Sequence, residues 1–61
     1  MKIRRLTATI QYCNSGRTEE RTVTCLFDDI SEQYELTKVF VVEFNQSLIF
    51  SKNDQTFLVN D

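Results

Sequence analysis

The sequence predicts a small α+β domain built mainly from antiparallel β-strands, in the order strand, strand, short helix, strand, strand, strand. Two observations support this fold class. Polar and apolar residues alternate in two N-terminal segments that flank the only glycine of the chain, which is typical of a β-hairpin. The C-terminal third holds three short segments rich in β-branched and aromatic residues, which favours a three-stranded meander.

We expect one domain over residues 1–61, made of a hairpin (1–27), an acidic crossover or short helix (28–37) and a meander (38–61). Hydrophobic residues make up 41% of the chain and include five phenylalanines, a composition that indicates folding rather than disorder. A domain of this size buries only about 60% of the surface that its unfolded chain exposes. Its core therefore supplies a stability of about 3–5 kcal/mol, which favours self-association.

The N-terminal hairpin is predicted from residues 6–12 and 22–27, in which every second residue is apolar. We expect Gly16 and Arg17 to form a two-residue type II′ turn, because its first central position needs positive φ. This turn places Leu6 opposite Phe27. The predicted inward face consists of Leu6, Ala8, Ile10, Tyr12, Val23, Cys25 and Phe27.

The two cysteines carry no predicted chemistry. In this register Cys13 and Cys25 lie far apart along the hairpin, so we expect no disulfide and interpret Cys25 as a core residue. Because the chain has no histidine, two cysteines cannot complete an ordinary zinc site. We therefore expect neither a metal nor a cofactor.

The acidic segment after the hairpin has features of a short helix. Asp29 followed by Glu32 resembles a capping box, and Ile30 and Tyr34 are spaced to share one helix face. This pattern predicts a helix over residues 30–36. An irregular acidic crossover is the alternative, because isolated helices of this length are marginally stable.

The predicted meander has strands at residues 39–44, 48–51 and 55–60. A three-residue loop after the first strand and a turn at Asn53-Asp54 bring one set of apolar side chains onto a common face. That set is Phe40, Val42, Phe44, Leu48, Phe50, Phe57 and Val59.

The opposite face of this meander is also apolar, whereas a sheet with one solvated face should alternate cleanly. We therefore predict that the helix or a second copy of the chain covers it, and we expect a homodimer. The candidate interface residues are Val39, Val41, Ile49 and Leu58.

Two helical turns cannot cover both the hairpin and the meander. The larger cover must be sheet on sheet, as two packed sheets or one strongly curled sheet. A compact five-stranded barrel of the SH3 or OB general kind is the alternative.

Catalysis is not predicted. Without histidine, acid–base chemistry would rely on carboxylates, and the Asp28-Asp29 pair is better explained by its position at a helix start. Cys13 faces Glu20 in the predicted register, and a nearby carboxylate disfavours the thiolate. We expect a protein that is not an enzyme.

The charge layout suggests one alternative function. Residues 1–27 carry five basic and two acidic side chains, whereas residues 28–61 carry two basic and seven acidic ones. A basic hairpin with an aromatic residue is one way to bind single-stranded nucleic acid, although the acidic pI of about 4.9 argues against it. The candidate contacts are Lys2, Arg4, Arg5, Tyr12, Arg17 and Arg21.

Protein binding is the function that we expect. The first residues lack a signal-peptide pattern and no apolar run approaches the roughly 20 residues that span a membrane, so we expect a complete, cytoplasmic gene product. A small protein without catalytic groups most often acts by docking on another protein. An accessory or inhibitor protein of a phage or mobile element fits that description.

Overall fold

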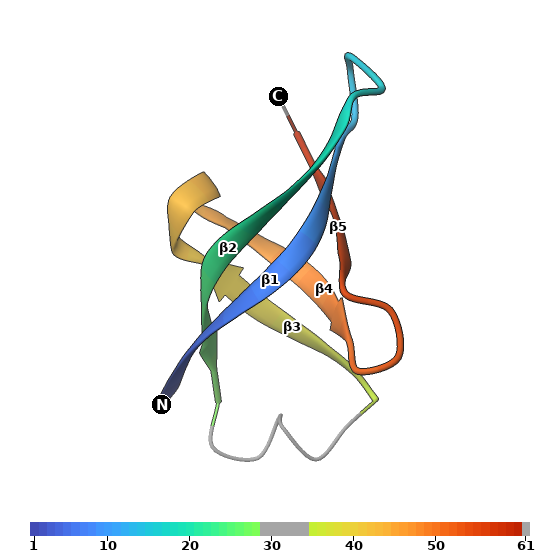
Figure 1. The fold of residues 1–61 in the computed structure, drawn as a ribbon. Coiled ribbons are helices and arrows are strands. Elements are labelled where there is room, and N and C mark those ends of the chain that lie inside the picture. Colours follow the sequence, from blue (N-terminus) through green and yellow to red (C-terminus); the bar gives the residue numbers. More distant parts are fainter. Residues whose placement is uncertain (29–34, 61) are drawn as a thin grey trace.

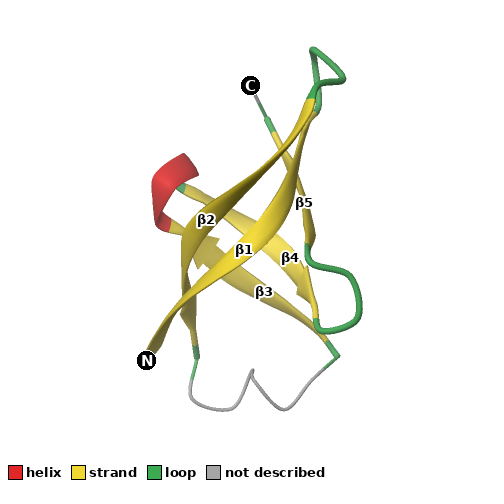
Figure 2. Ribbon diagram, viewed as in Figure 1, coloured by secondary structure: helices red, strands yellow, loops and turns green. Residues whose placement is uncertain are grey.

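The computed structural model describes residues 1–28 and 35–60, which form a curled β-sheet (Figures 1 and 2). Its sheet order is β4-β3-β2-β1-β5, and its outer strands approach each other so that the sheet nearly closes into a barrel. The alternative prediction of a small five-stranded barrel is therefore confirmed for the general architecture. The elements are β1 (Lys2–Tyr12), β2 (Thr18–Phe27), β3 (Leu36–Val41), the 3-10 turn η2 (Val42–Phe44), β4 (Gln46–Ser51) and β5 (Thr56–Val59).

The only helical element in the described part of the chain is η2, so the α+β expectation is not met there. The predicted helix over 30–36 falls largely on residues 29–34, which lie outside the described residues. Its last residue, Leu36, is the first residue of β3.

The inward faces of the N-terminal hairpin are confirmed. Ala8 and Ile10 of β1 and Val23, Cys25 and Phe27 of β2 are buried in the core. Alternation with period two therefore identified the buried side of both strands correctly.

The register of this hairpin differs from the prediction, because Leu6 lies opposite Val23 rather than Phe27. The loop has four residues, 13–16, closed by hydrogen bonds from Tyr12 N to Arg17 O (2.8 Å) and from Gly16 N to Tyr12 O (2.9 Å). Gly16 has the expected positive φ, 72°. Moving a turn by one residue shifts the partner strand by two, which preserves both faces, so alternation alone cannot choose among these registers.

The prediction for the face of β3 is wrong. Val39 and Val41 point into the core, whereas Val42 is 48% exposed. The strand ends at Val41, and η2 with Asn45 (φ 53°) reverses the chain, so that Val41 pairs with Gln46. Because both faces of this segment are apolar, the loop geometry decides which one is buried.

The last strand also has a different partner from the one predicted. β5 does not form a hairpin with β4 but pairs in parallel with β1, where Phe57 lies opposite Ile10. At the open side of the barrel, the Gln46 side chain of β4 bonds to the backbone of Asn60, the residue after β5. Its Nε2 donates to Asn60 O (3.0 Å) and its Oε1 accepts from Asn60 N (3.3 Å).

A second side chain, that of Glu43, bonds to β2 where the pairing of β2 with β3 ends. These strands pair only at Cys25–Val41 and Leu26–Phe40. Beyond that point the Glu43 carboxylate accepts hydrogen bonds from Thr24 N (2.8 Å) and Thr24 Oγ1 (2.9 Å). These bonds favour the charged carboxylate and lower the pKa of Glu43, and the bond from the Thr24 N–H has the largest effect.

Glu43→Gln should make the fold less sensitive to acid. A lowered pKa means that the carboxylate stabilises the fold above the unfolded pKa of 4.5, and that this contribution is lost as the pH falls through the folded value. Glutamine keeps an acceptor for Thr24 but does not titrate. Urea unfolding from about pH 6 to about pH 3 measures the effect, with Glu35→Gln as control. Equal acid sensitivity of wild type and Glu43→Gln would contradict the contact.

Candidate functional site

Three apolar side chains form a row across the outer face of the sheet. Ile3 of β1 lies opposite Leu26 of β2, and Leu26 lies opposite Phe40 of β3. Ile3 is 66% exposed, Leu26 and Phe40 are half-buried, and Met1, which directly precedes β1, is 78% exposed. We call Met1, Ile3, Leu26 and Phe40 the outer strip.

The strip faces outward because its residues alternate with core residues. Cys25 and Val41 point inward, so their neighbours Leu26 and Phe40 point to the other side of the sheet. Further along the hairpin the same outer face is polar, as in the pair Thr7–Thr22. The exposed apolar surface of the hairpin is therefore concentrated near the N-terminal end of β1.

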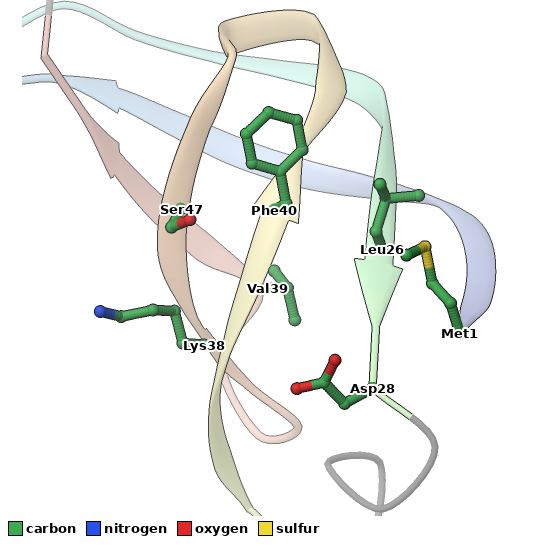
Figure 3. A pocket seen from close by; sticks show the side chains of 7 residues that line it. All are labelled: Met1, Leu26, Asp28, Lys38, Val39, Phe40 and Ser47. Carbon is green, nitrogen blue, oxygen red and sulfur yellow. The ribbon is translucent and has the colours of Figure 1, made fainter.

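A hollow of about 420 Å³ adjoins the strip, where β2 and β3 diverge beyond their last pair (Figure 3). Asp28 follows β2 and its carboxylate points toward β3, whereas the Lys38 side chain extends toward β4. The hollow thus combines apolar walls with one acidic and one basic group. Its lining residues are Met1, Leu26, Asp28, Lys38, Val39, Phe40 and Ser47.

The four predicted interface residues do not form one surface. Val39 and Val41 belong to the core, whereas Ile49 and Leu58 are exposed. The exposed pair lies on two different strands, Ile49 on β4 and Leu58 on β5. Because the buried face of β3 is the opposite of the one predicted, Val39 and Val41 lie in the core and Ile49 and Leu58 on the surface.

The basic residues proposed for nucleic-acid contact fall into separate groups. At the hairpin end of the barrel, the Arg17 guanidinium lies 4.8 Å from the Tyr12 ring centroid, and Arg21 lies 5.1 Å from that of Phe44. The Tyr12 hydroxyl donates to Glu19, a bond that raises the tyrosine pKa. The Tyr12 ring is therefore covered rather than presented for base stacking.

The remaining basic residues lie toward the other end of β1. Arg4 is eight residues from Tyr12, about 26 Å along a strand, and its guanidinium lies 6.0 Å from the Phe27 ring centroid. Lys2 is also at this end, and Arg5 belongs to the outer face, opposite Thr24. In the observed register Arg4 lies opposite Cys25.

Both cysteines are free thiols. Cys25 is buried in the core, as predicted, and burial raises its pKa to about 11. Cys13 is exposed in the hairpin loop, and Glu20, predicted to face it, instead lies opposite Thr9. The described residues contain no group of three or more His, Cys, Asp or Glu side chains arranged to hold a metal ion.

The outer strip was not identified from the sequence, although a signal was present. Ile3 and Leu26 are apolar residues at positions that the alternation of their strands assigns to the outer face. An apolar residue out of phase on each of two paired strands indicates an exposed patch. Recognising that they are neighbours required the observed register.

Other features of the chain do not assign a function. No helix in the described ranges, 1–28 and 35–60, is long and apolar enough to cross a membrane. Comparisons with protein-family models, curated proteins and solved structures give no significant match to this chain.

Proposed function

We propose that this protein is a protein-binding module that docks on a partner protein through the outer strip and the adjacent hollow. The observation that carries this proposal is the row Ile3–Leu26–Phe40, extended by Met1, on the outside of a sheet whose core is on the other side. Contiguous apolar side chains on the surface of a small protein mark interaction sites. Single exposed apolar residues, such as Leu58, carry no such weight.

The hollow suggests the chemistry of the partner. Its apolar walls suit an apolar or aromatic anchor side chain, the type that dominates binding energy in protein interfaces. Asp28 and Lys38 provide charges of both signs around it, which favours a partner segment with complementary charges on either side of the anchor. The proposed occupant is therefore a protein segment with one large apolar residue flanked by a basic and an acidic residue.

Single-stranded nucleic acid has less support as a partner. Stacking needs an accessible aromatic face, and Arg17 and Glu19 contact the Tyr12 side chain. The basic groups are also separated along β1 instead of forming one groove. Nucleic-acid binding is therefore one of the outcomes that the crosslinking experiment distinguishes.

Site-specific photo-crosslinking in the native host tests the proposal. A benzophenone amino acid at Ile3 should capture one defined protein, whereas the same probe at Thr7 should not. Thr7 is the matched control because it is exposed, outward-facing and on the same strand. Leu26→Asp should abolish the Ile3 adduct while the circular-dichroism spectrum remains that of the folded protein.

Three results would overturn the proposal. They are an absence of any Ile3 adduct, identical adducts from Ile3 and Thr7, or nuclease-sensitive adducts formed from a probe at Arg17 alone. The last result would favour nucleic acid and would identify the hairpin end as the binding site.

A further inference from the structure

β2 is an interior strand by sheet order but an edge strand over its first half. It pairs with β1 over its whole length, but within the described residues it pairs with β3 only at Cys25 and Leu26. Glu43 accepts the hydrogen bond of Thr24 N, the next backbone donor on that side. Among the described residues, no strand pairs with this side of β2 between Thr18 and Val23.

The backbone direction at this edge follows from two hydrogen bonds. Tyr12 N donates to Arg17 O, so the odd-numbered residues of β2 and its preceding loop bond toward β1. Thr24 N points the other way, toward Glu43. The N–H and C=O groups of Thr18, Glu20 and Thr22 therefore point away from β1. They belong to the half of β2 that is nearer the hairpin loop (Figure 1).

This edge lacks one common protection against strand pairing, since the chain contains no proline. It does carry charged residues, which often prevent such pairing. Here, however, the charges have both signs, because Glu19 and Glu20 precede Arg21. Their order determines whether a second copy would be repelled or attracted.

We propose that a second copy of this chain pairs with the open edge of β2, antiparallel and centred on Glu20, to form a two-fold symmetric dimer. In this register Thr18 lies opposite the partner's Thr22, and Glu19 lies opposite the partner's Arg21. The symmetry repeats both pairs, so the dimer gains two facing pairs of opposite charge. Glu19 and Arg21 are on the same side of the strand, and both remain exposed although Glu19 accepts a hydrogen bond from Tyr12 and Arg21 lies over the Phe44 ring.

The neighbouring registers are less favourable. Only even-numbered residues present hydrogen-bonding groups at the edge, so even-numbered residues must face each other. The nearest alternative registers therefore place the two-fold axis at a neighbouring residue instead of Glu20. Centring on Arg21 places two arginines opposite each other, and centring on Thr22 places Arg21 opposite the partner's Val23. Only the Glu20-centred arrangement matches the charges, at the cost of one Glu20–Glu20 contact on the outer face.

This dimer goes beyond the proposed docking function, because it uses a different part of β2. The outer strip crosses β2 at Leu26, near its C-terminal end, whereas the dimer edge is Thr18–Thr22. Failure of one proposal therefore leaves the other intact.

Proline substitution at the edge tests the dimer. Thr22→Pro removes an N–H that points away from β1, a position where strands tolerate proline, so the monomer should remain folded. Analytical ultracentrifugation should show dimers for wild type and for the control Thr22→Val, and monomers for Thr22→Pro. Glu20→Thr should tighten the dimer by up to about fivefold, because it removes the like-charge contact.

Hydrogen exchange provides a readout that does not depend on how well a variant folds. In the wild type, exchange of the Glu20 and Thr22 amides should slow as protein concentration rises, while exchange of Ser15 in the loop should not change. The proposal is wrong if wild type and Glu20→Thr both remain monomeric at high micromolar concentration. It is also wrong if folded Thr22→Pro dimerises as well as Thr22→Val, or if these amides exchange independently of concentration.

Discussion

Val41→Glu should unfold the protein, whereas Val42→Glu, one residue further along, should leave the fold intact. Val41 is 0% exposed and Val42 is 48% exposed. Placing a carboxylate in the core costs several kcal/mol of folding free energy, which matches or exceeds the stability of about 3–5 kcal/mol expected for a domain of this size. A substitution at an exposed position typically changes stability by no more than about 0.5 kcal/mol.

Circular dichroism and thermal unfolding measure this pair of variants. The comparison tests the face of β3 directly, because the two possible faces predict opposite outcomes. A folded Val41→Glu with an unfolded Val42→Glu would mean that Phe40, Val42 and Phe44 form the core face. Ile49→Glu is a second control, and its exposed position on β4 predicts little change in stability.

Phe57→Ala should remove about 3–5 kcal/mol of stability, so that the variant is largely unfolded at room temperature. Phe57 lies opposite Ile10 on β1, and its ring centroid is 6.3 Å from that of Phe50 on β4. Phe50 in turn makes an edge contact with Phe27, at 5.2 Å between centroids. Loss of the Phe57 ring therefore leaves a cavity where β5, β4 and β2 meet.

Leu58→Ala is the matched control on the same strand, because Leu58 is 58% exposed whereas Phe57 is 1% exposed. Urea unfolding should give a midpoint for Leu58→Ala close to that of wild type. Equal loss of stability in both variants would show that β5 is buried on both faces, as it would be in a larger assembly. Little loss in either variant would show that β5 does not contribute to closing the barrel.

The outer strip was partly accessible from the sequence. Ile3 and Leu26 break the alternation of their strands, and this is visible without a structure. Phe40 carried no such signal, because it belongs to a run that is apolar on both faces. The hollow beside it depends on the point where β2 and β3 separate, which no local pattern specifies.

What the sequence by itself determined is local. Alternation with period two identified the buried sides of β1 and β2, and the lone glycine marked the position of positive φ at Gly16. Alternation also placed Cys25 correctly in the core. Each of these features depends on the conformation of a single segment.

The tertiary structure decided which segments meet and in what register. Alternation is unchanged when one strand of a hairpin slides by any even number of residues, so Leu6 could face Phe27 or, four residues away, Val23 with the same sides buried. In β3 both faces are apolar, and the reversal through η2 selected Val39 and Val41 for the core. β5 pairs with β1 at the far end of the sheet from β4, although it follows β4 in the chain. The strong curl of the sheet permits this, because it brings the two ends of the sheet close together, a property of the whole barrel.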